Sequence, residues 1–276
     1  MNASTRKSIN LAVELRSGRH YGVFIDDTGS PGLDTPGLHK LRKSWVAVLV
    51  SPDKIAEVMD QLPGALSFLQ ELGLDDPELH FTDIWGGRGE YRKLDLQQRL
   101  GIFRFMAYIF TTYRFPVLVQ TFDPANASAV RNRANWPDSL GPLKFSDHED
   151  LALIFALLRV RLHLKTLTGG NATACVIVDE GRLSSGSAIV LPGLAPTFFA
   201  GAILFASSRL VLPIQLADFA AFVMSRWQLL RVKDSLSDLD KTLLEIISPI
   251  AENFVNIDSA TIHDFPNISS LRQGLN

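Results

Sequence analysis

Cysteine is nearly missing from this sequence, and so is net charge. The 276 residues contain one cysteine, Cys175, so no internal disulfide can form. This is typical of proteins kept in a reducing compartment, and we expect a cytoplasmic location. The 27 basic and 29 acidic residues leave a formal net charge of −2. A polyanionic partner such as nucleic acid would therefore need a local basic surface on this protein.

Long uninterrupted apolar runs are also missing. The two most apolar stretches, 191–224 and 151–164, are broken by charged residues and a histidine. The interrupting residues are Arg209, Asp218, Arg159, Arg161 and His163. Neither stretch supplies the roughly 20 apolar residues that a membrane span needs, and residues 1–18 lack the apolar core of a signal peptide. We expect a soluble protein with no membrane partner.

Several well-known catalytic motifs are absent as well. The sequence has no Walker loop, no G-x-S-x-G elbow, no H-E-x-x-H helix and no Cys/His spacing for zinc. With 46% hydrophobic residues and ordinary numbers of glycine (19) and proline (14), the chain is neither disordered nor fibrous. A globular protein with a sizeable core remains.

The apolar pattern predicts an α/β domain with a mixed sheet flanked by helices. Strands are expected at 20–27, 44–51, 115–122, 173–179 and 202–206, and helices at 52–72, 96–113, 147–167, 213–230 and 237–254. Pro63 is expected to kink or split the first helix, residues 78–83 to be extended, and 123–146 to form a long loop. We expect one domain over 19–260 that carries an inserted helical segment between 52 and 113, a loose arm over 1–18 and a tail over 261–276.

Acidic residues at the ends of two predicted strands are the first chemical signal. Asp26 and Asp27 end the first strand, and Asp179 ends an apolar strand of the kind buried on both faces. Ligands of open α/β sheets bind at the carboxyl ends of strands, although aspartate before glycine is also common in turns. Consecutive strand residues point to opposite sides, so Asp26 and Asp27 are expected to separate, and Asp26 is favoured for the site.

Asp218 lies inside an otherwise apolar helix. Gln215 precedes it by three residues and therefore shares its helix face. A buried carboxylate is costly unless hydrogen-bond donors, a cation or a metal neutralise it. The alternatives are a polar face that meets solvent and an aspartate satisfied by backbone. Gln215 is a candidate to bind a substrate phosphate, or else to satisfy nearby backbone.

Three carboxylates that converge would repel one another unless a cation held them together. Oxygen ligands favour Mg²⁺ or Mn²⁺, and a pair of such ions activates water and stabilises the leaving oxygen in phosphodiester hydrolysis. Asp26, Asp179 and Asp218 are thus the candidate metal ligands and catalytic residues.

Four sequence blocks resemble the family called domain of unknown function 3800, assigned to the ribonuclease H-like superfamily. The blocks are IDDTGSPG, ELHFTDI, VIVDEG and ILFASSRLVLPIQLADFAAF, in that order, over about residues 21–227. The resemblance implies a mixed five-stranded sheet and a metal-dependent nuclease-type centre at Asp26, Asp179 and Asp218. It adds Glu78 as a further metal-ligand and catalytic candidate. The family usually has glutamate where this chain has Asp27.

His80 lies two residues after Glu78, so both would face one side of an extended segment. It is a candidate general acid or base, and a hydrogen-bonded structural histidine is the alternative. The best local basic region, 84–104, includes Arg88 and Arg92 with interleaved aromatics, which suits phosphate contact and base stacking. Trp136, in the predicted loop, is a further candidate for substrate binding.

The sequence therefore predicts a ribonuclease H-like α/β enzyme that hydrolyses nucleic-acid phosphodiester bonds with Mg²⁺ or Mn²⁺. Its expected partner is RNA or DNA, and the apolar helices after residue 213 leave a homo-oligomer open. One alternative is a non-catalytic module that binds nucleic acid or protein. Another is a metal-dependent hydrolase of small phosphorylated metabolites, which a closed, narrow pocket over the acids would favour.

Overall fold

A mixed six-stranded sheet forms the centre of the computed structural model, which describes residues 13–28, 34–75, 77–133 and 136–255. The strand order is β3-β2-β1-β6-β8-β7. The strands are β1 (Tyr21–Asp27), β2 (Lys43–Val50), β3 (Val117–Phe122), β6 (Ala174–Asp179), β7 (Ala188–Val190) and β8 (Phe198–Ala206). β1, β2 and β3 run antiparallel in sequence order, β6 and β8 are parallel to β1 and to each other, and β7 returns antiparallel on β8.

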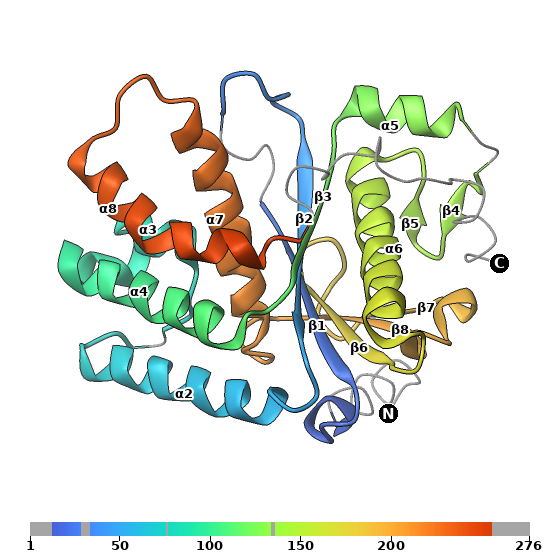
Figure 1. Cartoon of the computed structure of the whole chain (residues 1–276), viewed down its shortest axis with the longest axis horizontal. Helices are drawn as coiled ribbons and strands as arrows, with labels where there is room; N and C mark the ends of the chain where they lie inside the picture. Colours follow the sequence, from blue (N-terminus) through green and yellow to red (C-terminus); the bar gives the residue numbers. More distant parts are fainter. Residues whose placement is uncertain (1–12, 29–33, 76, 134–135, 256–276) are drawn as a thin grey trace.

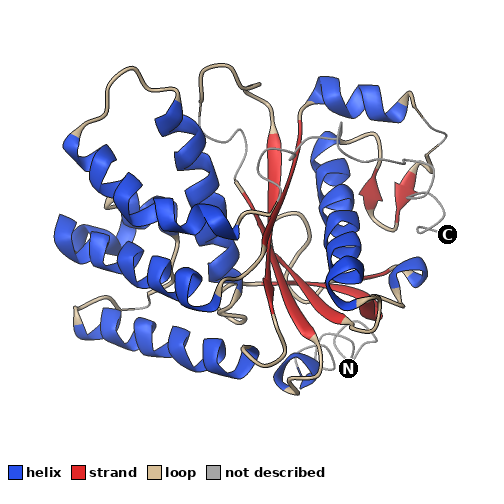
Figure 2. Cartoon of the chain, viewed as in Figure 1, coloured by secondary structure: helices blue, strands red, loops and turns tan. Residues whose placement is uncertain are grey.

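Helices cover both faces of this sheet (Figures 1 and 2). One face carries α6 (His148–Thr168), with α5 (Pro124–Arg131) beside it. The other face carries α7 (Ile214–Arg231), which packs on β1 and β2, and outside it the remaining helices. These are α2 (Ile55–Glu71), α3 (Phe81–Gly86), α4 (Leu96–Tyr113) and α8 (Asp238–Ile247).

Short elements complete the chain. They are the 3-10 turns η1 (Gly89–Lys93), η2 (Pro192–Leu194) and η3 (Ser248–Asn253) and a small hairpin of β4 (Ser139–Leu140) and β5 (Leu143–Lys144). The central strands are apolar because they are buried on both faces: the five residues of β6 before Asp179 are all buried. Most apolar residues of α7 are likewise buried within the chain itself, and Trp227 and Leu229 are half-buried.

The predicted α/β class with a mixed sheet and flanking helices is confirmed, with several local corrections. Residues 123–146, expected to be a loop, contain α5 and the β4–β5 hairpin. The segment expected to be extended over 78–83 enters α3 at Phe81, and the short strand expected at 202–206 begins at Phe198 and pairs with β7. α2 continues through Pro63, whose ring is exposed to solvent.

The two chain ends bear on the expected domain limits. Of the arm expected to be loose, residues 13–18 are described; residues 13–16 are helical and Leu15 is buried in the core. The predicted tail, 261–276, lies outside the described residues. No helix in the described part of the chain is long and apolar enough to cross a membrane.

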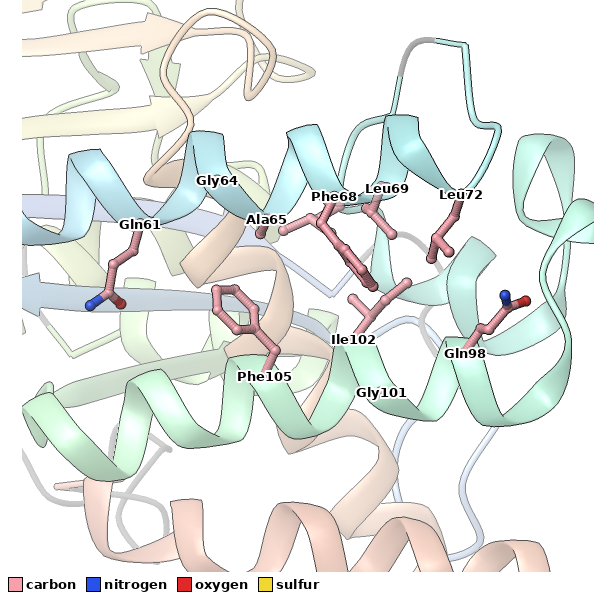
Figure 3. Close-up of a pocket in the computed structure, with 11 residues that line it drawn as sticks. Gln61, Gly64, Ala65, Phe68, Leu69, Leu72, Gln98, Gly101, Ile102 and Phe105 are labelled. Carbon is pink, nitrogen blue, oxygen red and sulfur yellow. The ribbon is translucent and has the colours of Figure 1, made fainter.

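An apolar groove of about 730 Å³ separates α2 from α4. Phe68 and Phe105 project into it, and Gln61 and Gln98 stand at its opposite ends (Figure 3). The groove is wide partly because Gly101 faces it: a Cβ atom at this position would meet no described heavy atom within 4 Å.

We expect Gly101→Ala to stabilise the protein, because alanine favours a helix over glycine by about 1 kcal/mol and fits here without a clash. As a matched comparison, Gly201→Ala should destabilise by at least about 1 kcal/mol. Gly201 has φ +61°, and its Cβ would lie 2.8 Å from the Leu191 carbonyl oxygen. Urea unfolding of both variants measures the two changes in the free energy of unfolding. Equal changes would contradict the prediction that an alanine side chain fits at Gly101 and not at Gly201.

Candidate functional site

Asp26 and Asp179 end the two central parallel strands at the same edge of the sheet. β1 and β6 are paired in register up to Ile25 and Val178, so the two aspartates follow at neighbouring positions. Each aspartate lies two residues after an apolar residue that packs in the layer of α7, Phe24 on β1 and Ile177 on β6. Residues two apart in a strand share one face of the sheet. Both carboxylates are therefore directed towards the layer that contains α7.

Asp218 comes to the same place from α7. It is partly buried, and its Oδ2 accepts a hydrogen bond from the backbone N–H of Phe81 at 3.4 Å, where α3 begins. The pKa of Asp218 is raised to about 7: burial raises it most, the nearby charge of His80 and the Phe81 hydrogen bond lower it, and the charges of Asp179 and Glu78 raise it. Asp218 thus lies within electrostatic reach of the strand-end Asp179 and of Glu78.

The other two aspartates show the same electrostatic crowding. Burial raises the pKa of Asp179 to about 6. The pKa of Asp26 is raised well above its usual value, first by burial and then by the charges of Asp218, Asp179 and Asp27. Each carboxylate thus lies within electrostatic reach of the others, and negative charge on all three is unfavourable without a cation.

Two buried oxygen atoms of the site have no hydrogen-bond partner among the residues that the structure describes. They are Oδ1 of Asp179 and Oε1 of Gln215. Gln215 is 1% exposed, and its Nε2 donates to the Ser208 carbonyl at 3.3 Å. A buried acceptor without a donor costs about 1–3 kcal/mol, and oxygen atoms of this kind suit Mg²⁺ or Mn²⁺. Within the described residues, no three acidic, histidine or cysteine side chains are already arranged to hold a metal ion.

Ser208, in the loop between β8 and α7, connects the parts of this site. Its backbone N–H hydrogen-bonds the Asp179 carboxylate and so lowers that pKa. Its carbonyl accepts the Gln215 amide, and its hydroxyl donates to Oε1 of Glu78. A serine after a strand is common, so the sequence singled it out only weakly.

Glu78 lies near Asp179 and Asp218, and both of its carboxylate oxygens are hydrogen-bonded by neighbouring side chains. Besides the Ser208 hydroxyl on Oε1, Arg209 donates through Nε to Oε2 at 2.8 Å. The Tyr91 hydroxyl donates to the Glu78 backbone carbonyl. Burial, and next the charge of Glu78, raise the pKa of Tyr91. Glu78 therefore lies near Asp179 and Asp218, and its carboxylate is neutralised by Arg209, which sequence reasoning did not identify.

His80 and Arg88 line a polar hollow of about 150 Å³ beside Glu78. His80 is exposed, with Nδ1 3.2 Å from Oδ2 of Asp83. Arg88 contacts the same carboxylate through Nε at 3.0 Å. Asp83 thus orients both side chains, a role that the sequence did not distinguish from helix capping.

Asp27 lies on the opposite side of β1, as strand geometry predicts. Its carboxylate pairs with Lys43 Nζ at 2.8 Å, on a lysine side chain that is only 6% exposed. The α6 face holds a second polar cluster, in which Arg182 binds Asp147 and the buried Asp150. Both groups have their counter-charges in place, which indicates a structural role.

The residues predicted to bind nucleic acid divide into two groups. Arg88 and Arg92 are exposed, and Arg88 lines the hollow beside the acids. Trp136 instead packs on the α6 side of the sheet, stacked on Phe145 with ring centres 5.4 Å apart, and its Nε1 donates to the Val130 carbonyl. The geometry thus groups Arg88, but not Trp136, with the acids.

Comparisons with known proteins return no match: no family model, no curated protein and no solved structure is similar to this chain. The fold and the site define an α/β protein with acidic side chains at the carboxyl edge of a mixed sheet. A functional assignment therefore depends on the chemistry of this site.

Proposed function

We propose that this protein is a divalent-metal-dependent nuclease of the ribonuclease H-like kind. One observation carries the proposal: aspartates from β1, β6 and α7 lie within electrostatic reach of one another, and the pKa of each is raised by burial and by nearby carboxylates. The buried unpaired oxygens of Asp179 and Gln215 independently support a cation at this position. A mixed sheet flanked by helices is also what the sequence resemblance implies.

Asp26, Asp179 and Asp218 would hold Mg²⁺ or Mn²⁺, with Glu78 in support. A cation bound there supplies the means to lower the pKa of an attacking water and to stabilise a leaving oxygen. Gln215 keeps its amide oxygen turned away from Ser208, because its Nε2 is bound to the Ser208 carbonyl. This orientation leaves the oxygen available to a cation or to a water molecule.

His80 is the best-placed general acid or base among the residues around the hollow. Its Nδ1 faces Asp83 at 3.2 Å, which leaves Nε2 for proton transfer to or from a substrate. The exposed side chain of Arg88 can contact a backbone phosphate near the same carboxylate. A group for proton transfer, His80, and a group for phosphate contact, Arg88, are thereby provided at the same hollow.

The small polar hollow and its exposed arginines support a polymer over a small metabolite. The hollow adjoins the metal site through Glu78 and measures about 150 Å³, whereas pockets that enclose small molecules span about 300–1,000 Å³. A phosphodiester of a nucleic acid can lie across such a site with most of the polymer outside it. The basic side chains at its mouth suit a substrate of this kind.

The direct test is cleavage by the full chain of end-labelled single-stranded and duplex DNA and RNA. We expect strand scission with Mn²⁺ or Mg²⁺ and none in EDTA. Crystals soaked in MnCl₂ should show anomalous density between Asp26, Asp179 and Asp218. Nucleic-acid binding without cleavage, unaffected by EDTA, would overturn the proposal in favour of a binding module. Hydrolysis restricted to small phosphorylated metabolites would favour the third function.

A further inference from the structure

Arg209 occupies the carboxylate that the proposed metal site needs as its fourth acid. Its Nε lies 2.8 Å from Oε2 of Glu78, and the hydroxyl of Ser208 binds the other oxygen, Oε1. Both oxygens of Glu78 therefore already have donors. A cation that ligated Glu78 would have to share this carboxylate with the positive charge of Arg209, and the two cations would repel each other.

The arginine is placed so that it can give up this contact. Its side chain is 56% exposed, whereas the Glu78 side chain is 25% exposed. Arg209 belongs to the short connection between β8 and α7 and borders the polar hollow together with His80 and Arg88. An ion pair that solvent reaches is typically worth less than about 1 kcal/mol, so this contact by itself opposes the exchange only weakly.

We propose that Arg209 is an exchangeable counter-ion, which competes with the divalent cation for Glu78 and, once displaced, binds a phosphate of the substrate. This inference rests on the proposed metal site. A guanidinium group forms paired hydrogen bonds to phosphate, which suits the second task. Cation and nucleic acid would then support each other's binding, because the cation releases the arginine that the nucleic acid needs.

Arg88 provides a matched control because it differs in the one relevant contact. It borders the same hollow, is similarly exposed (59%) and carries the same charge. Its carboxylate partner, however, is Asp83, with Nε to Oδ1 at 3.0 Å. Removing either arginine changes the local charge equally, but only the loss of Arg209 frees Glu78.

Isothermal titration of the full chain with Mn²⁺ tests the competition. We expect Arg209→Gln to bind Mn²⁺ about three- to fivefold more tightly than the wild type, and Arg88→Gln to differ by less than about twofold. In a Glu78→Gln background, Arg209→Gln should bring no further gain. Equal gains from both arginine variants, or a gain that persists without Glu78, would overturn the exchange.

Binding of a fluorescent phosphorothioate oligonucleotide, which resists cleavage, tests the second task. Arg209→Gln should weaken this binding several-fold with Mn²⁺ present and leave it unchanged in EDTA. Equal weakening in both conditions would overturn the link to the metal. Mn²⁺ binding by the variants separates the two proposals. If Asp179→Asn abolishes Mn²⁺ binding and Arg209→Gln leaves it unaltered, the exchange of Arg209 for the cation is refuted and the proposed function stands. A wild-type chain that binds no Mn²⁺ overturns both.

Discussion

Replacing Asp218 by asparagine should abolish metal-dependent cleavage and at the same time make the metal-free protein more stable. Asn keeps the shape of the side chain and still accepts the Phe81 N–H, but it removes a charge from a group whose pKa is raised to about 7. At pH 8 in EDTA we expect a gain of about 2–4 kcal/mol in the free energy of unfolding. Activity should fall by more than about 100-fold, since even residues behind metal ligands contribute that much.

Urea unfolding and cleavage assays on the same preparations measure both effects. Asp179→Asn should behave in the same way, with a smaller gain in stability because its pKa is raised less, to about 6. Asp60→Asn, which removes an exposed carboxylate from α2, is the matched control and should change neither quantity. Retained cleavage in both site variants would refute the metal site, and a loss of stability would refute the electrostatic crowding.

The second large effect concerns pH. The three aspartates have raised pKa values, so between about pH 4 and pH 7 the folded protein holds protons that the unfolded chain has released. Without metal, the free energy of unfolding should therefore fall by a few kcal/mol, about 3 or more, as pH rises through this range. Burial of His163 lowers its pKa and acts in the opposite direction, but it is a single group on α6.

Metal should reverse this loss. At pH 8, Mn²⁺ at a hundredfold excess over its dissociation constant adds about 2.7 kcal/mol. Thermal or urea unfolding at pH 4.5, 6 and 8, with EDTA or Mn²⁺, measures the effect. The Asp218→Asn variant should show a flatter pH dependence and little response to Mn²⁺. A wild-type stability that rises from pH 4.5 to pH 8 in EDTA would contradict the prediction.

The sheet and its acids were largely readable from sequence because both depend on local patterns. An unbroken apolar run ending in an acid, as at Asp179, predicts a strand buried on both faces with a polar group at its end. Strand alternation separated Asp26 from Asp27, and the structure pairs Asp27 with Lys43 on the far side of β1. An acid within the apolar α7 likewise marked Asp218.

What could not be predicted depends on contacts between distant segments. Arg209 binds a residue 131 positions away in the chain, and no local pattern reports such a pairing. Trp136 is an aromatic residue in a basic stretch of sequence, which suggested substrate binding. In the structure its ring stacks on Phe145, a contact that no local pattern predicts. α5 was missed because its eight residues are too few to show helical periodicity, although Asp123 caps the helix and a proline starts it.

The residues of the site come from two different parts of the chain, the central sheet with α7 and the segment that links β2 to β3. The three aspartates stand on β1, β6 and α7, while His80, Asp83 and Arg88 all come from that one connecting segment, 51–116. Apart from Arg209, the side chains named around the polar hollow therefore come from one contiguous stretch of the chain. Sequence changes confined to this insert between two antiparallel strands would reshape the hollow and leave the three aspartates in place.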